Sequence, residues 1–134
     1  TDATSVEFLS ADAIPVFLNK RERRPDSFLQ KFVVPKLDHN TSIQCVWTPF
    51  MCLVNRRKNV NNLYDTRFSL HDKCVTHEGQ PHQTTEVFVG PLVQKRCADV
   101  CRRMAAHMQT HERRVLLRIV AYFKMDQSGD TFFL

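Results

Sequence analysis

Four potential metal ligands lie within one short segment, in the pattern His71-x-x-Cys74-x-x-His77-x-x-x-x-His82. Zinc binds histidine nitrogen and cysteine sulfur in a tetrahedron, and structural zinc sites usually contain at least two thiolates. This segment contains a single cysteine. The pattern therefore favours exposed loop histidines around a half-buried cysteine, with His71, Cys74, His77 and His82 as weak candidates for a metal site. We expect no bound metal and no cofactor.

Two cysteines and two histidines recur at helical spacing further along the chain, as the pairs Cys97/Cys101 and His107/His111. On a helix, all four would lie on one face. A rise of about 1.5 Å per residue separates the centres of the two pairs by roughly 15 Å, which is too far for one tetrahedral ion. We therefore expect the cysteines to pack in the core.

Motifs for catalysis are missing from the sequence. Its three glycines stand alone, which excludes a P-loop and a dinucleotide-binding fingerprint. Neither G-x-S-x-G nor H-E-x-x-H occurs. A nucleophilic cysteine needs a nearby histidine, and Cys74 beside His71 and His77 is the only local candidate. We predict that the domain is not an enzyme and that it has no small-molecule substrate.

Positive charge exceeds negative charge, with 19 Lys and Arg, 14 Asp and Glu, and a formal net charge of +5. The basic residues form short, separated runs, which are compatible with a scattered solvated surface or with a patch assembled in three dimensions. An assembled patch could bind an acidic protein or the phosphates of RNA. The candidate binding residues are Arg56, Arg57, Arg96, Arg103, Arg118 and Tyr122.

The second half of the chain contains the clearest elements. Apolar residues recur along 91–112 in a single helical stripe, and Pro91 suits the first turn of a helix. The alternation in 115–124 leaves one face wholly apolar, which predicts a core strand. Residues 126–130 then predict a hairpin turn, with Gly129 free to adopt positive φ, followed by a returning strand.

The first half predicts shorter elements. Residues 43–54 indicate either a bulged edge strand or two short strands, because Pro49 interrupts a run of strand-forming residues. We expect a helix over 26–32, a hairpin loop over 55–62, and further strands near 63–70, 74–76 and 85–89. The predicted fold is an α+β domain, in which a curled antiparallel sheet of about five or six strands packs against the helix 91–112, which a β-hairpin follows. The predicted core consists of Trp47, Cys52, Phe68, Val87, Val93, Cys97, Val100, Cys101, Met104, Leu117, Ile119 and Phe123.

The cysteines and the chain ends bear on cellular context. Five cysteines without a pairing pattern, and no N-terminal charged segment leading into an apolar one, favour reduced thiols in the cytoplasm. No apolar run approaches the length of a membrane span, so we expect no membrane association. The chain begins without methionine and stops in an apparent strand, so we expect residues 1–134 to be a single domain cut from a longer protein.

Two segments, Val46-Trp-Thr-Pro-Phe50 and 118–126 running on to Phe132-Phe-Leu134, resemble a little-characterised domain of proteins in eukaryotic cilia and flagella. The resemblance brings no catalytic or binding residues with it. It implies a non-catalytic scaffold module of a cytoskeletal assembly, which binds another protein or a second copy of itself. An RNA-binding or ribonucleoprotein subunit that uses the same basic residues is the alternative.

Overall fold

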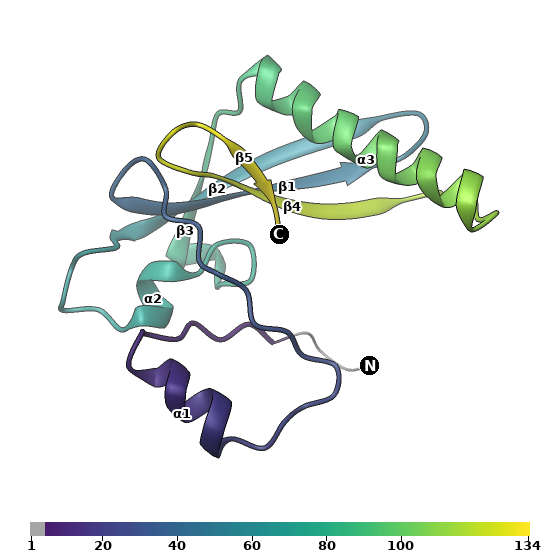
Figure 1. Cartoon of the computed structure of the whole chain (residues 1–134). Helices are drawn as coiled ribbons and strands as arrows, with labels where there is room; N and C mark the ends of the chain where they lie inside the picture. The colour runs from purple at the N-terminus through teal and green to yellow at the C-terminus, as the bar shows by residue number, and fades with distance from the viewer. Residues whose placement is uncertain (1–4) are drawn as a thin grey trace.

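The computed structural model describes residues 5–134 and has a five-stranded antiparallel sheet with helices on both sides (Figure 1). The strand order is β3-β2-β1-β4-β5, so the sheet is open and β3 and β5 are its edges. This confirms the predicted α+β class. The elements in chain order are α1 (Ala13–Lys20), β1 (His39–Trp47), β2 (Cys52–Asn62), α2 (Leu70–Cys74), a 3-10 turn (Pro81–Gln83), β3 (Thr84–Val87), α3 (Pro91–His111), β4 (Ile119–Met125) and β5 (Thr131–Phe133).

The helix α3 covers one face of the sheet, and its observed range confirms the predicted 91–112. Its apolar stripe points at the sheet, and Cys97 and Cys101 are completely buried against the strands. Ile43, Cys45, Ala121 and Phe123 of the two central strands complete the buried core under α3. None of the helices in residues 5–134 is long and apolar enough to cross a membrane.

The hairpin β1–β2 forms because Pro49 lies in its turn, where a missing amide donor costs no ladder hydrogen bond. Thr48 closes the turn, since its amide donates to the Met51 carbonyl at 2.8 Å and its hydroxyl accepts from the amides of Phe50 and Met51. Of the two alternatives for 43–54, two separate strands are correct. Both are longer than the sequence suggested.

The polar stretch 55–62, predicted as a loop, belongs to β2. Asn59 explains the difference, because its side chain is fully buried and donates to the carbonyls of Asp72 and Val75 at 3.0 and 2.8 Å. The stretch is polar because it bonds to the segment that covers the face of the sheet opposite α3. Periodicity in hydrophobicity cannot identify a strand of this kind.

The N-terminal half differs from its predicted elements in several places. The first helix is α1, not 26–32, and Phe28 is 84% exposed. The predicted strands 63–70 and 74–76 are wrong, because this region contains turns and α2, whose first turn is capped by Ser69. α2 and α1 lie on the side of the sheet opposite α3 (Figure 1).

Two predicted core residues are exposed, Leu117 by 74% and Phe68 by 39%. The alternating pattern starts at residue 115, but β4 starts to pair at Ile119, opposite Trp47 at the end of β1. Beyond Trp47, β1 offers Leu117 no backbone partner.

Candidate functional site

A groove of about 400 Å³ lies between α3 and the β4–β5 hairpin. Arg96, Val100 and Arg103 form its helical wall, since residues at this spacing share one side of a helix. Thr131 and Phe133 form the opposite wall. They stand two residues apart on β5, so their side chains point to the same face of the sheet. The groove is therefore built from segments that are distant in the sequence.

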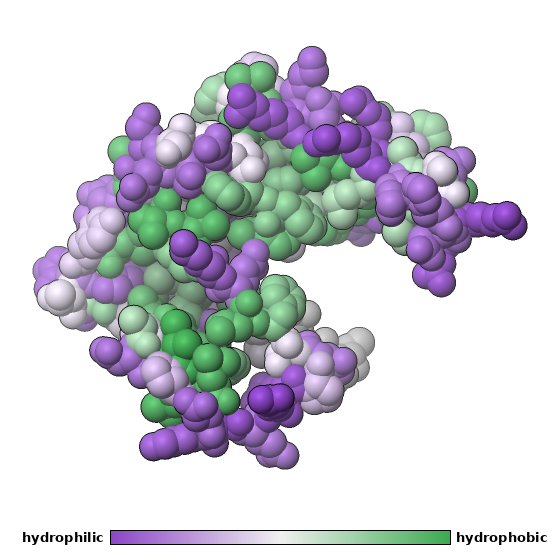
Figure 2. All heavy atoms as spheres, viewed as in Figure 1, coloured by the Kyte–Doolittle hydropathy of each residue, from purple (hydrophilic) through white to green (hydrophobic). Residues whose placement is uncertain are grey.

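The floor of the groove is aromatic. Phe123 of β4 lies directly opposite Phe133 of β5 in the strand register. Their rings meet edge to face, with centroids 5.6 Å apart. Figure 2 shows an apolar band beneath the polar outer side of α3. The two rings and Val100 give the groove an apolar base that can accept an aliphatic or aromatic side chain.

The rim of the groove carries free positive charge. The side chains of Arg96 and Arg103 are exposed, and neither forms an ion pair with another residue of 5–134. Asp99 also lines the groove, but its carboxylate accepts a hydrogen bond from Arg102 at 2.8 Å. The hydroxyl oxygen of Thr131 is buried and finds no hydrogen-bond partner within the described chain. Two guanidinium groups and an unpartnered hydroxyl can together bind an anionic group.

The edge strand β5 adds backbone groups to this wall. The amide of Leu134 donates to the Tyr122 carbonyl at 2.9 Å, and Phe132 lies opposite Lys124. Bonding direction alternates along an antiparallel strand, so the amides and carbonyls of Thr131 and Phe133 point away from β4. These groups form the free edge of the sheet beside the groove. Such an edge can pair with an extended chain.

The other predicted arginines are separated from this groove. Arg56 and Arg57 are neighbours on β2 and point to opposite faces of the sheet. Arg56 points under α3, where its Nη2 donates to the sulfur of Met125 at 3.0 Å and burial lowers the pKa of its guanidinium. Arg57 points to the other face and donates to the hydroxyl of Thr84 at 3.1 Å.

Arg118 and Tyr122 also lie apart from the groove. Arg118 is exposed and precedes β4. Tyr122 points to the face opposite α3, where its hydroxyl accepts a hydrogen bond from Gln44 at 2.9 Å and its ring meets the edge of His77 at 5.7 Å. Among the six predicted binding residues, the structure brings together Arg96 and Arg103.

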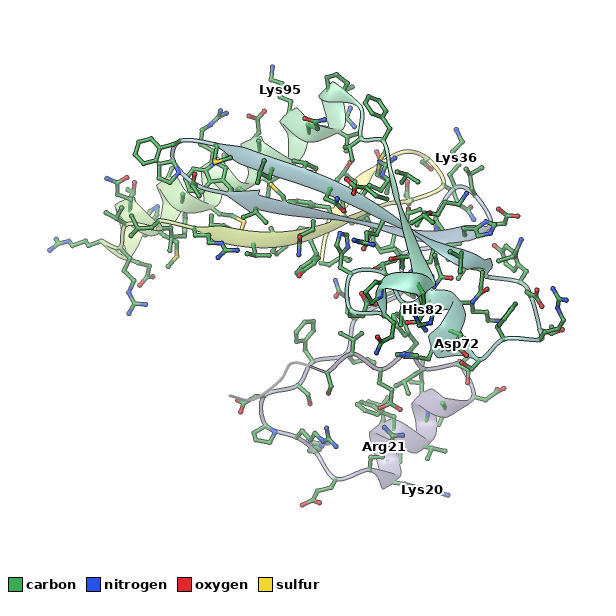
Figure 3. All side chains as sticks on the ribbon, turned by 180° about the vertical axis from the view of Figure 1, so that it is seen from behind. Lys20, Arg21, Lys36, Asp72, His82 and Lys95 are labelled. Carbon is green, nitrogen blue, oxygen red and sulfur yellow. The ribbon has the colours of Figure 1, made fainter. Side chains whose placement is uncertain are left out.

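The four weak metal candidates do not converge. His71 is exposed beside Phe8, Cys74 is buried, and His82 is exposed in the 3-10 turn. Figure 3 shows His82 and Asp72 near α2, on the side of the sheet opposite Lys95 of α3. His77 is partly buried, which lowers its pKa, and its Nδ1 lies 2.8 Å from the Ser42 hydroxyl. Within 5–134, no group of three or more His, Cys, Asp or Glu side chains is placed to hold a metal ion.

A buried polar network closes the face opposite α3. Ser42 donates to Thr76 at 2.6 Å, and Thr76 donates to Glu78 at 3.1 Å. Lys124 is only 5% exposed, and its ammonium lies 3.6 Å from the centre of the Phe32 ring. Burial lowers the pKa of Lys124 to about 8. This network attaches residues 70–78 and the N-terminal segment to the sheet.

Sequence reasoning missed the strand wall of the groove. It predicted a returning strand after residues 126–130 but did not assign Thr131 and Phe133 to the face under α3. Pairing the residues of the hairpin outward from its turn could have found Phe133, because it then lies opposite Phe123 and on the same face.

Comparison of the chain with known protein families, with curated proteins and with solved structures finds no match. In the groove, two arginines without ion pairs in 5–134, an aromatic floor and an unpaired strand edge lie side by side.

Proposed function

We propose that this domain is a non-catalytic protein-interaction module, and that the groove between α3 and β5 binds an extended, acidic segment of a partner protein. The observation that carries the proposal is the free edge of β5 beside the two unpaired arginines of α3. Together with the resemblance to ciliary and flagellar proteins, it supports a scaffold role in a cytoskeletal assembly.

The backbone of the partner would pair with β5. Strand addition at a free sheet edge supplies main-chain hydrogen bonds, while pockets beside the edge select alternate side chains. Thr131 and Phe133 offer the donors and acceptors for one such pairing. The floor around Phe123 and Phe133 would then receive an apolar side chain of the added segment.

Charge would select the partner. Arg96 and Arg103 are two helical turns apart, about 10 Å along the axis. Side chains on one face of an extended chain repeat about every 7 Å. Two carboxylates placed two to four residues apart in the partner can therefore reach both guanidinium groups. Such pairs are exposed, so their contribution to affinity falls as salt rises.

RNA binding through the same residues has weaker support. Arg56 and Arg57 point to opposite faces, and Arg118 and Tyr122 lie away from Arg96 and Arg103. The predicted basic residues therefore do not line one continuous surface, as phosphate contacts along a strand of RNA require.

Selection from a random-peptide library, followed by affinity measurement with the selected peptides, tests the proposal. We expect peptides with acidic residues two to four positions apart around an apolar residue. The double variant Arg96→Glu/Arg103→Glu should weaken their binding at least about tenfold. Arg114→Glu, an exposed change outside the groove, is the matched control and should leave affinity unchanged.

Selected peptides without acidic residues, or with affinity unchanged in the double variant, would overturn the proposal. Tighter binding of RNA homopolymers than of any selected peptide, abolished by the same double variant, would favour the ribonucleoprotein alternative.

A further inference from the structure

Three of the five thiols form a contact group in the core, centred on Cys45. The sulfurs of Cys45 and Cys52 are 3.0 Å apart, and the sulfur of Cys101 is 3.7 Å from that of Cys45. Cys45 and Cys52 belong to adjacent strands of the β1–β2 hairpin and point to the face under α3. All of these cysteines are free thiols.

The members of this group differ in access. Cys45 and Cys101 are completely buried, whereas Cys52 is partly exposed. Cys52 lines a cavity of about 270 Å³ between β2 and the first turns of α3, with Gln94 and Lys95 in its wall. Figure 3 shows Lys95 projecting outward from the N-terminal half of α3. A small polar molecule can therefore enter this cavity from solvent and approach Cys52.

We propose that Cys52 and Cys45 form a peroxide-reactive thiol pair, in which Cys52 is oxidised first and Cys45 closes a disulfide across the β1–β2 hairpin. The proposal rests on the cavity at Cys52 and on the contact between the two sulfurs. It is independent of the groove, which lies on the other side of α3.

The reaction balances with hydrogen peroxide as the oxidant. The sulfur of Cys52 attacks one peroxide oxygen, so that an S–O bond forms, the O–O bond breaks and water leaves with the thiol proton. The sulfur of Cys45 then attacks the sulfur of Cys52, so that the S–S bond forms and the S–O bond breaks. The departing hydroxide takes the proton of Cys45 and leaves as a second water. Two thiols are oxidised and one peroxide is reduced to two waters.

The order of the two steps follows from the surroundings of the thiols. Burial, with the neighbouring Cys52 and Cys101, raises the pKa of Cys45 far above its usual range. Burial also raises the pKa of Cys97 to about 11. A thiolate, not a thiol, attacks peroxide, so these buried groups are poor first nucleophiles. The raised pKa also slows Cys45 in the second step, but contact with the sulfur of Cys52 makes that attack intramolecular and offsets the loss.

We expect the proposed disulfide to act as a modification and to add little to the stability of the fold. Only residues 46–51 separate the two cysteines, and the hairpin hydrogen bonds already join their strands. A bond that closes so short a loop removes little freedom from the unfolded chain. Cys45 pairs with Val54 and Cys52 with Trp47, so the two cysteines are diagonal neighbours across the hairpin. A disulfide length of about 2.05 Å therefore requires the sulfurs to approach by about 1 Å, with a small shift of the hairpin backbone.

Peroxide titration of the folded protein tests the pair. We expect the intact mass to fall by two hydrogens, alkylation under denaturing conditions to add three groups instead of five, and peptide mapping to locate the bond at Cys45–Cys52. In Cys45→Ala, the sulfenic acid on Cys52 should persist and react with dimedone, at least about tenfold faster than any other cysteine. Cys74→Ser is the matched control, because Cys74 lies on the other side of the sheet, and it should form the bond at the wild-type rate.

The mapping experiment on the wild-type protein decides the proposal even where a variant fails to fold. A Cys45–Cys101 bond, oxidation at Cys97 or Cys74 ahead of Cys52, or sulfinic acid without a disulfide would each overturn it. So would an equal rate of Cys45–Cys52 bond formation in guanidinium, because closeness in the sequence would then suffice. Peptide binding in the groove gives a separate readout, so the two proposals can fail independently.

Discussion

Different interactions hold the covering segments on the two faces of the sheet. Under α3, the buried side chains are Ile43, Phe123 and a group of cysteines, and dispersion and loss of apolar surface hold the layers together. On the opposite face, the buried side chains include Asn59, Ser42 and Lys124, and hydrogen bonds to residues 70–78 hold the cover in place.

This difference shows why one cover is a long helix and the other is irregular. A helix satisfies its own backbone, so α3 needs only an apolar stripe to pack on the sheet. The short helix α2 and the residue after it leave backbone carbonyls free at Asp72 and Val75, and a buried asparagine on the sheet bonds to them. The groove forms on the helical side, where β5 extends the sheet beside α3.

The largest effect is expected on the apolar face, from Phe123→Ala. Phe123 is 1% exposed, packs in the core under α3 and contacts the ring of Phe133. Its loss leaves a cavity, so the free energy of unfolding should fall by about 3 to 5 kcal/mol. Phe132→Ala is the matched control on the same hairpin, since Phe132 is 44% exposed, and it should cost less than about 1 kcal/mol. Denaturant titration measures both, and equal losses would contradict the comparison.

The next effect is expected on the polar face, from Asn59→Ala. This change leaves the Val75 carbonyl without its buried donor and the Asp72 carbonyl with Asn61 alone, which should cost about 2 to 3 kcal/mol. Hydrogen exchange should become faster in residues 70–78 and stay unchanged in α3. Asn61→Ala, which removes one partly buried bond to Asp72, should have a smaller effect. Faster exchange in α3 alone would show that the two covers are not independent.

The elements of the face under α3 could be predicted from the sequence, because the local periodicity of apolar residues indicates them. The stripe of α3, the apolar face of β4 and the turn at Gly129, which has φ of 86°, follow from spacings of 3.6 and 2 residues and from one glycine. Arg96 and Arg103, candidate binding residues in the sequence, share the helical wall of the groove, and their role in binding stays a prediction.

The polar face and the strand wall of the groove were not predictable in this way. Asn59 looks like a loop residue until the carbonyls that it bonds are known, and those carbonyls belong to α2 and the residue after it. Thr131 and Phe133 become part of the groove only because β5 pairs with β4 beneath α3. Both depend on contacts between distant segments, which a single sequence does not encode locally.

A pH-dependent effect of intermediate size is expected from Lys124→Met. The pKa of Lys124 is lowered to about 8 in the folded protein, so below that pH the fold must bury a charged ammonium. Cys74, Glu78 and the Phe32 ring surround it. At pH 7 the variant should be more stable by about 2 kcal/mol, because the cost of burial exceeds the lost cation–π contact.

The sign of the pH dependence distinguishes Lys124 from the buried thiols. Between pH 8 and the usual lysine pKa, the unfolded state binds the proton of Lys124 more tightly, so this group makes the wild-type protein more stable as pH rises. The buried thiols, whose pKa values are raised in the folded protein, act in the opposite direction, because the unfolded chain loses their protons first. Stability curves of wild type and variant should therefore converge toward pH 10. Parallel curves would contradict the assignment.

The smallest effect is expected from Tyr122→Phe, at the partly exposed border of the polar face where the Tyr122 ring meets His77. The hydroxyl of Tyr122 accepts a hydrogen bond from Gln44, but the side chain is 37% exposed and water can replace that partner. The change should alter the free energy of unfolding by less than about 0.5 kcal/mol. Ser42→Ala, two residues before Gln44 on β1, removes a buried hydrogen bond to Thr76 and a partly buried one to His77, and should cost about 1 to 2 kcal/mol. If the two variants lost the same free energy of unfolding, burial under residues 70–78 would not explain the stability of the polar face.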